Sequence, residues 1–166
     1  HVDLFINSIP FIIKKQPNTR FYITRKGDLL NEIHNMAKTL GIQINYFWFA
    51  HESPLYRFMS TCHTGVLTSS NNISYRLSPP AKLFDYMSVG LPIVANDIGG
   101  WTSILKEEGS GILTADDPQA FSNGVLEMIE NPELAQKCGQ RGLELTKGKY
   151  NWDNITEKLV SLYETL

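Results

Sequence analysis

One predicted helix start combines features suited to binding an anion. Residues 78–82 (Ser-Pro-Pro-Ala-Lys) begin the helix, with Lys82 in its first turn. Free backbone N–H groups at a helix N-terminus attract anions, and the helix dipole already makes that end positive. A cation there is unfavourable unless an anion lies nearby. Pro80, Ala81 and Lys82 are therefore candidate ligands of a phosphate group.

A carboxylate follows in the same helix. Asp85 lies one turn after Lys82 and faces roughly the same side. Such a carboxylate can accept hydrogen bonds from two ribose hydroxyls, as acidic residues do in dinucleotide-binding folds. The alternative is a simple ion pair between Asp85 and Lys82, worth only a few tenths of a kcal/mol. The spacing therefore predicts either a nucleotide site or an ordinary surface pair.

Two further segments have unusual chemistry, and each has a structural alternative. Arg25, Lys26 and Gly27 place two cations and a flexible residue after a predicted strand, where they can meet a phosphate or the rim of a base. A solvated turn is the simpler explanation of these residues. Gly99 and Gly100 lie between a strand and a helix, where glycine permits either close approach to a ligand or a tight turn.

The elements that position these residues follow from apolar periodicity. Short extended runs alternate with amphipathic stretches, which predicts an α/β fold with a Rossmann-like parallel sheet and helices on both faces. The predicted strands are 21–24, 42–49, 65–68, 92–95 and 111–114. The predicted helices are 1–15, 28–40, 53–62, 80–89, 101–107, 117–130, one from 132 and one from about 151, with 69–79 irregular. Ligands of such sheets bind beyond the carboxyl ends of the strands, at 25–27, 48–51, 69–82 and 96–100.

The two ends of the chain carry further expectations. The sequence enters directly into a helix with no cap before it, which predicts that a first strand of the sheet is missing upstream. In the last helix, the apolar spacing predicts that four side chains face inward: Ile155, Leu159, Leu162 and Leu166. Trp101 and Trp152 are expected to serve packing rather than stacking on a ligand.

Composition limits the class of protein. The 166 residues are 42% hydrophobic and 19% charged, which suits one domain with its own core. A net charge of −2 favours neither nucleic acid nor an anionic membrane as partner. Cys62 and Cys138 lie far apart with no metal-ligand spacing, which argues against a zinc site or a disulfide. No apolar run approaches the ~20 residues of a membrane helix, and we expect a cytoplasmic protein.

Residues 78–100 resemble a family signature. They read SPPAKLFDYMSVGLPIVANDIGG, similar to the pattern S-P-x-K-x-x-E-Y-M-x-x-G-x-P-V-V-A-x-x-x-G-G of the group 1 (GT4-type) retaining glycosyltransferases. Residues 109–113, 117–118 and 150–153 also resemble this family, and residues 1–68 match more loosely. The resemblance covers nearly the whole chain.

The resemblance implies the C-terminal half of a GT-B fold, in which two Rossmann-like domains face a cleft. This half would hold a UDP- or GDP-sugar donor, with no metal and no other cofactor. Asp85 would hold the ribose hydroxyls, and Pro80, Ala81 and Lys82 would lie against the sugar and diphosphate. Arg25, Lys26 and Gly27, with Phe49 and His51, would border the base.

The missing N-terminal domain would bind a glycan or lipid acceptor, and the last helix would cross back to it. A lipid acceptor implies peripheral attachment to the inner face of a membrane. The Arg and Lys that neutralise the diphosphate would lie upstream of His1, so that no catalytic residue is assigned here. The mechanism implied is transfer with retention, in which a leaving phosphate oxygen takes the proton of the acceptor hydroxyl.

Three positions depart from the family pattern. Asp85 is one methylene shorter than the usual Glu, Leu77 replaces a further Glu, and Ser103 stands where Glu often follows the two glycines. We expect the whole protein to transfer a hexose and this chain alone to be inactive. The alternatives are a non-catalytic nucleotide-binding or interaction module, and a sugar-nucleotide epimerase of the same fold. A response-regulator-like domain would need an acidic cluster at the strand ends, which are basic or neutral here.

Overall fold

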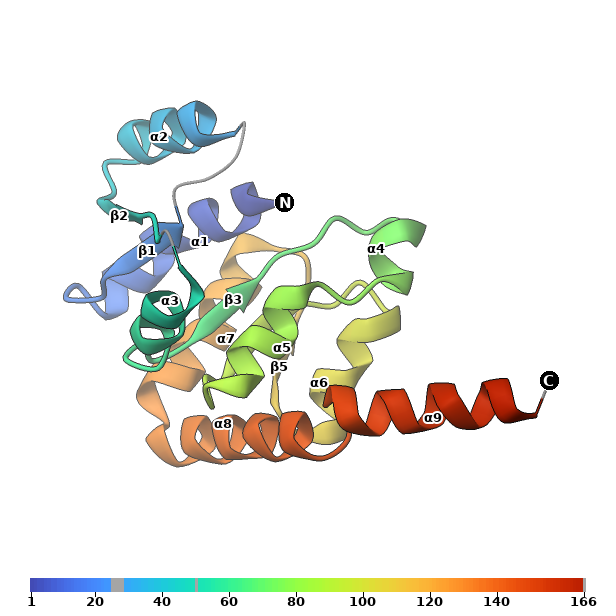
Figure 1. Ribbon diagram of the computed structural model, residues 1–166. Coiled ribbons are helices and arrows are strands. Elements are labelled where there is room, and N and C mark those ends of the chain that lie inside the picture. Colours follow the sequence, from blue (N-terminus) through green and yellow to red (C-terminus); the bar gives the residue numbers. More distant parts are fainter. Residues whose placement is uncertain (25–28, 50, 166) are drawn as a thin grey trace.

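The computed structural model describes residues 1–24, 29–49 and 51–165, and it confirms the predicted α/β architecture (Figure 1). Parallel strands alternate with helices along the chain. The strands are β1 (Phe21–Thr24), β2 (Ile44–Phe47), β3 (Gly65–Leu67), β4 (Ile93–Asn96) and β5 (Gly111–Thr114). The helices are α1 (Val2–Lys15), α2 (Leu30–Thr39), α3 (Glu52–Met59), α4 (Ile73–Leu77), α5 (Ala81–Ser88), α6 (Ser103–Glu108), α7 (Pro118–Glu130), α8 (Pro132–Lys147) and α9 (Trp152–Glu164). A 3-10 turn, η1 (Gly100–Thr102), precedes α6.

The strands of the described residues form two parallel sheets. β1 pairs with β2, with Phe21 opposite Ile44, and β4 lies between β3 and β5 in the second sheet. A single sheet containing a further upstream strand was the sequence-based expectation. Within the described ranges, β1 and β3 each pair with a strand on one side only.

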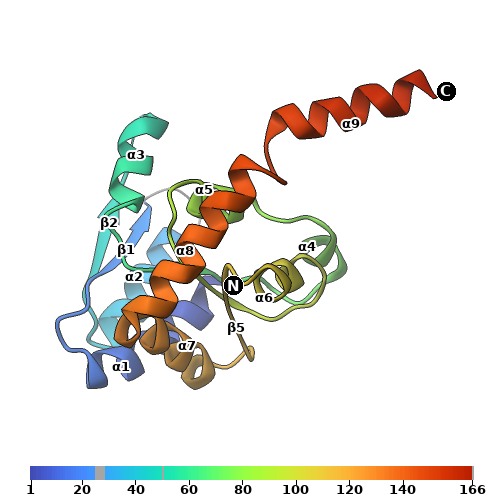
Figure 2. The same cartoon turned by 90° about the horizontal axis from the view of Figure 1, so that it is seen from below.

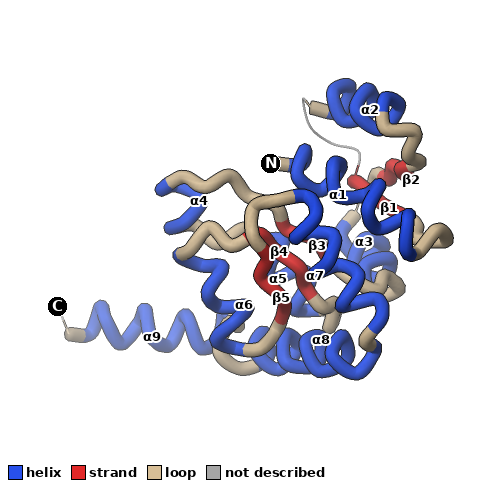
Figure 3. Tube along the Cα trace, turned by 180° about the vertical axis from the view of Figure 1, so that it is seen from behind, coloured by secondary structure: helices blue, strands red, loops and turns tan. Residues whose placement is uncertain are grey.

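The core consists of two apolar clusters on opposite faces of β4. Val94 belongs to a first cluster beneath α1 and α7, whereas Ile93 and Ala95 belong to a second cluster beside α5 and α6. This alternation follows from the period of two in a strand, which sends successive side chains to opposite faces. Figure 3 shows α7 over one face of these strands.

The first cluster also joins the two sheets. Ile6 and Ile9 of α1 are fully buried and pack with Phe21 of β1 and with Phe121 of α7. Burial of each such side chain stabilises the fold by roughly 1.5–3 kcal/mol. Helix α1 therefore holds the β1–β2 sheet against the β3–β5 sheet.

Predicted helix caps are confirmed at two sites. The side chains of Asp117 and Asn151 accept hydrogen bonds from the backbone N–H groups of Ala120 and Asn154. The predicted cap at Asp28 lies outside the described residues.

The segment predicted as irregular contains a short helix. Helix α4 begins after Asn72, whose side chain accepts a hydrogen bond from the backbone N–H of Tyr75. A helix of five residues is too short to show periodicity, and its cap was not recognised in the sequence.

The inward orientation predicted for α9 is wrong. Ile155, Leu159 and Leu162 are 40%, 49% and 58% exposed, and Trp152 is 80% exposed. Leu166 lies outside the described residues. Figures 1 and 2 show α9 projecting away from the rest of the chain, so that the described part offers no surface to its apolar side. Trp101, by contrast, is buried as predicted.

The glycine pair that follows β4 serves the packing of α4 against η1. Gly100 has φ +61°, and a Cβ atom there would lie 2.2 Å from the carbonyl oxygen of Arg76 in α4. Gly99 has φ +72° and ψ −172°, and no atom of the described residues lies within 4 Å of an added Cβ. Glycine is therefore required at position 100 because the turn packs tightly against α4. At position 99 it is required only because the backbone has a positive φ.

We expect Gly100→Ala to lower the free energy of unfolding more than Gly99→Ala. Gly99→Ala incurs backbone strain of about 1–3 kcal/mol. Gly100→Ala adds to similar strain a clash with the α4 backbone, about 1–3 kcal/mol more, because overpacking forces the backbone to move. Urea unfolding of both variants and the parent protein measures the difference. Equal losses would contradict the assigned close contact.

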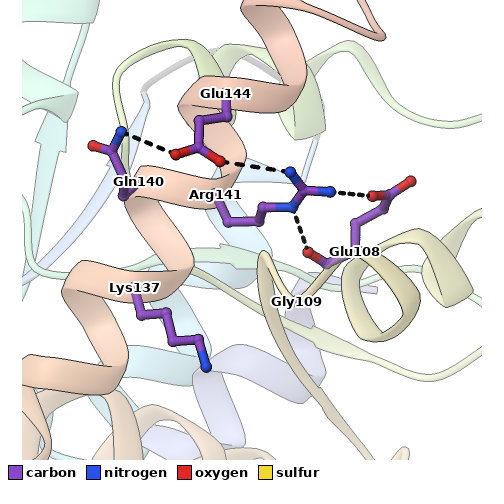
Figure 4. A pocket seen from close by; sticks show the side chains of 6 residues that line it. All are labelled: Glu108, Gly109, Lys137, Gln140, Arg141 and Glu144. Atoms are coloured by element: carbon purple, nitrogen blue, oxygen red, sulfur yellow. Dashed lines mark hydrogen bonds and ion pairs between the residues drawn. The ribbon is translucent and has the colours of Figure 1, made fainter.

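An ion-pair network fastens α6 to α8. The guanidinium of Arg141 donates to Glu108 Oε2 at 2.8 Å, and Lys149 Nζ lies 2.5 Å from Oε1 (Figure 4 shows the Arg141 side). The Glu108 side chain is only 17% exposed. The hydrogen bond from Lys149 is the largest cause that holds the pKa of Glu108 below its ordinary value of 4.5, and the Arg141 guanidinium acts in the same direction.

This network predicts stability that depends on pH. A carboxyl with a lowered pKa stabilises the folded state above its ordinary pKa and loses that contribution as the pH falls through the folded pKa. We expect Glu108→Gln to be less stable than the parent at pH 7, with the difference shrinking below about pH 4.5. Urea unfolding from pH 7 to pH 3 measures it, with Glu107→Gln as the exposed neighbour control. A difference independent of pH would refute the electrostatic origin.

Candidate functional site

Two of the segments predicted to bind a ligand, 69–82 and 96–100, follow the carboxyl ends of β3 and β4 and contact each other. After β3 the chain runs out through α4 and returns to begin α5 beside the carboxyl end of β3 (Figure 1). Asn96, at the end of β4, is buried and holds the start of the segment that connects β3 to α4. Its side-chain amide donates to the carbonyl of Ser69 at 2.8 Å and accepts from the N–H of Ser69 at 2.9 Å. The sequence analysis included Asn96 only as the first residue of the candidate segment 96–100 and gave it no role of its own.

The start of α5 has no side-chain cap. Pro80 occupies the N-cap position with extended backbone, and no side chain of the described residues bonds the first N–H groups of the helix. Ala81 and Lys82 are exposed. Unpaired N–H groups and an exposed ammonium in the first turn make this end of α5 positively polarised.

Asp85 is half-buried on α5, and its partner is a tyrosine. The hydroxyl of Tyr56, on α3, donates a hydrogen bond to Asp85 Oδ1 at 2.8 Å. The ion pairs formed among the described residues do not include Lys82 or Asp85, so the surface pair considered from the sequence is not present. Asp85 thus keeps acceptor capacity toward solvent, because a carboxylate can accept about four hydrogen bonds.

Tyr56 is a residue of the candidate site that the sequence analysis missed. It lies in the predicted helix 53–62, but nothing in the local sequence indicates that α3 packs beside α5, 29 positions further on. The hydrogen bond to Asp85 raises the pKa of Tyr56, and burial and the charges of Asp85 and Glu52 raise it further.

Phe49 lies in an aromatic cluster that we define as Tyr22, Phe47, Phe49 and Phe58. Phe49 stacks on Phe47 with ring centroids 6.1 Å apart, and its ring lies 5.7 Å from that of Phe58 in α3. Tyr22 contacts both Phe47 and Phe58. The cluster anchors α3, the helix that carries Tyr56.

His51 is exposed and immediately precedes α3, with no side-chain cap bond. The segment around Phe49 and His51 thus leads directly into the helix that reaches Asp85. Arg25, Lys26 and Gly27 lie outside the described residues, so their predicted place beside a base stays a prediction.

The arrangement suits a ligand that combines hydroxyls with an anion. Asp85 supplies an oriented acceptor for hydroxyls, and one turn earlier the helix start supplies donors for an anion. Among the residues described, His, Cys, Asp and Glu do not gather in threes at any point that would hold a metal ion. No helix in the described ranges has the length and apolarity to cross a membrane.

Comparison with known sequences gives remote relatives over nearly the whole chain. Spore coat protein SA of Bacillus subtilis (strain 168) is 22% identical over 172 residues, which cover 97% of this chain and 44% of the relative. Phosphatidyl-myo-inositol mannosyltransferase of Mycobacterium tuberculosis is 18% identical over 168 residues, covering 98% of this chain and 43% of the relative. The chain therefore spans less than half the length of these relatives.

Solved structures share the fold. Anabaena Alr3699/HepE in complex with UDP-glucose superposes with a TM-score of 0.79 at 17% identity, covering 99% of this chain and 45% of that one. A mutant of S. aureus TarM in complex with Fondaparinux, alpha-GlcNAc-glycerol and UDP gives a TM-score of 0.77 at 22% identity, covering 98% and 32%. The α/β fold is thus that of GT-B glycosyltransferases, as the sequence resemblance implied.

The family assignment rests on a match across most of the chain. The sequence profile described as "Glycosyl transferases group 1" matches residues 1–145, which include strands β1 to β5 and helices α1 to α7. The segment 78–100, which carried the resemblance in the sequence, lies inside this match and builds the start of α5, Asp85 and the glycine turn. The chain belongs to the group 1 family of glycosyltransferases.

Proposed function

We propose that this chain is the donor-binding part of an enzyme that moves a hexose from a UDP- or GDP-sugar to a glycan or lipid acceptor, with retention of configuration. The observation that carries the proposal is the half-buried Asp85 carboxylate, one turn inside a helix whose uncapped start lies at the carboxyl end of β3. Both groups lie within the family match, and they suit the hydroxyls and the phosphates of one nucleotide.

In the proposed complex, Asp85 accepts hydrogen bonds from the two ribose hydroxyls. The N–H groups at the start of α5 and the ammonium of Lys82 lie against the diphosphate and the sugar. Phe49 and His51 border the base, together with Arg25, Lys26 and Gly27. The proposal agrees with UDP and UDP-glucose in the complexes of TarM and HepE named above.

The proposed reaction breaks the bond between the anomeric carbon and the phosphate oxygen. The acceptor hydroxyl forms its new bond on the same face of the sugar, and its proton passes to a leaving phosphate oxygen. The negative charge that develops on the diphosphate is stabilised by the donors that surround it. The start of α5 supplies part of this stabilisation, and we place the remaining Arg and Lys upstream of His1.

We further propose that the acceptor site lies in another domain of the full protein. Two observations support this: the chain spans under half of its relatives, and the apolar side chains of α9 have no partner among the described residues. A domain packed on α9 would cover Ile155, Leu159 and Leu162. We place the full protein in the cytoplasm, at the inner membrane face when its acceptor is a lipid.

Nucleotide binding tests the donor site. We expect UDP or GDP, but not ADP or NAD, to bind the chain with a dissociation constant of about 1 mM when the upstream cations are absent. Asp85→Ala should weaken that binding at least about tenfold, because hydrogen bonds to a charged acceptor are lost. Saturation-transfer NMR and isothermal titration of the chain and of the full protein measure both.

Glu107→Ala removes an exposed carboxylate on α6 and serves as the matched control. Selective binding that depends on Asp85 supports the donor site and names the nucleotide. Binding by neither the chain nor the full protein would instead favour a non-catalytic relative that retains the family fold.

The exposed side of α9 gives a test of the domain arrangement. We expect Leu159→Ser with Leu162→Ser to leave the melting temperature of the isolated chain unchanged, because both side chains are already half-exposed. In the full protein the same pair should lower it by several degrees, since each buried leucine contributes roughly 1.5–3 kcal/mol. Glu157→Ser with Lys158→Ser is the control on α9. Equal melting temperatures in the full protein would refute the packing of another domain on α9.

A further inference from the structure

Tyr56 and Asp85 form a contact that the proposed donor site does not yet explain. Their helices, α3 and α5, follow different sheets, and the 2.8 Å hydrogen bond joins Tyr56 Oη to Asp85 Oδ1. Both side chains are half-buried, so the pair lies at the surface where a ligand can reach the carboxylate.

Both ends of this hydrogen bond are held by packing. On α3, Met59 is buried and Phe58 lies in the aromatic cluster, which fixes the helix that presents Tyr56. On α5, the ring of Tyr86 lies so close to Gly65 that a Cβ atom there would come within 2.6 Å of it. Leu83 and Met87 of α5 are fully buried. The donor and the acceptor are therefore presented by two anchored helices.

An aspartate needs such a partner because its last torsion is soft. The χ2 torsion of Asp has a broad, roughly two-fold distribution, so a carboxylate with no partner samples many orientations. A hydrogen bond to one oxygen selects one of them. Tyr56 uses one of about four acceptor positions and leaves Oδ2, and part of Oδ1, for other donors.

We propose that Tyr56 is a positioning residue that orients the Asp85 carboxylate toward the ribose hydroxyls of the donor nucleotide. The inference rests on the proposed function. Tyr56 acts through Asp85 and does not itself touch the reacting atoms. The phenol is in the donating form at the pH of the cell, because its ordinary pKa of 10 is already far above that pH and the hydrogen bond to Asp85 raises the pKa further.

The sharpest test compares a nucleotide with its analogue lacking both ribose hydroxyls. The probes are UDP and 2′,3′-dideoxy-UDP, or the guanosine pair if GDP is the nucleotide that binds. The ratio of their dissociation constants from the purified full protein measures recognition of the ribose hydroxyls alone. We expect Tyr56→Phe to weaken UDP about fivefold to tenfold and to leave the dideoxy analogue within about twofold of the parent.

A double-mutant cycle ties the effect to Asp85. Asp85→Ala should bring the ratio to about one, and Tyr56→Phe added to Asp85→Ala should change it no further, because the interaction is then already lost. Tyr22→Phe is the matched control, since it removes a phenolic oxygen from a half-buried ring that contacts Phe58 on the same helix. Tyr56→His keeps a ring that can donate a hydrogen bond and should restore part of the ratio.

The outcomes separate the two proposals. If Tyr56→Phe leaves the ratio of the two dissociation constants unchanged, whether or not both nucleotides bind more weakly, the positioning role is overturned. Selective nucleotide binding that depends on Asp85 would still support the donor site. Tighter binding of UDP by Tyr56→Phe also overturns it, because Tyr56 would then compete with the ribose. If the parent protein binds neither nucleotide, the donor site fails and the positioning role fails with it. Thermal unfolding shows whether the Tyr56→Phe variant folds. If that variant does not fold, the ratio measured for Tyr56→His tests the positioning role.

Discussion

The burial of β4 on both faces is the constraint on which the rest of the structure depends. Successive residues of this strand enter opposite clusters, Val94 beneath α1 and α7, Ile93 and Ala95 beside α5 and α6. A strand buried on both faces must be apolar throughout and must have neighbours on both edges, which β3 and β5 provide. The polar residue that ends β4, Asn96, then fixes the segment that leads to α5. The candidate site is thus attached directly to the most buried part of the chain.

Local signals in the sequence predicted most of the elements, because each depends on nearby residues. Alternating apolar runs located the strands, and caps such as Asp117 and Asn151 located helix starts. The failures were matters of tertiary context. The apolar spacing of α9 was read correctly, but a periodic pattern indicates only that a helix has an apolar side and not whether the chain supplies a surface for it. The separation into two sheets likewise depends on strand neighbours, about which local patterns carry no information.

The candidate site shows the same division. Asp85 and the start of α5 were identifiable because a carboxylate one turn after an uncapped, cationic helix start is a local arrangement. The sequence left open whether Lys82 pairs with Asp85, and the structure gives Asp85 a hydrogen bond from Tyr56 instead. That partner comes from the packing of two helices that follow different sheets. Gly100 is a third case. The sequence allowed either close approach to a ligand or a tight structural turn, and the closeness of Gly100 to the backbone of Arg76 favours the structural turn.

The exposed apolar side of α9 has a consequence for how the molecule behaves with other copies of itself. A covering surface on the same polypeptide competes at an effective concentration of order millimolar when the connection between the partners is short. Separate chains meet the same side chains only at the concentration of the solution. A free chain therefore gains a tendency to associate through Trp152, Leu159 and their neighbours as it is concentrated. A chain with an internal cover for α9 would remain monomeric until its concentration approached the millimolar range.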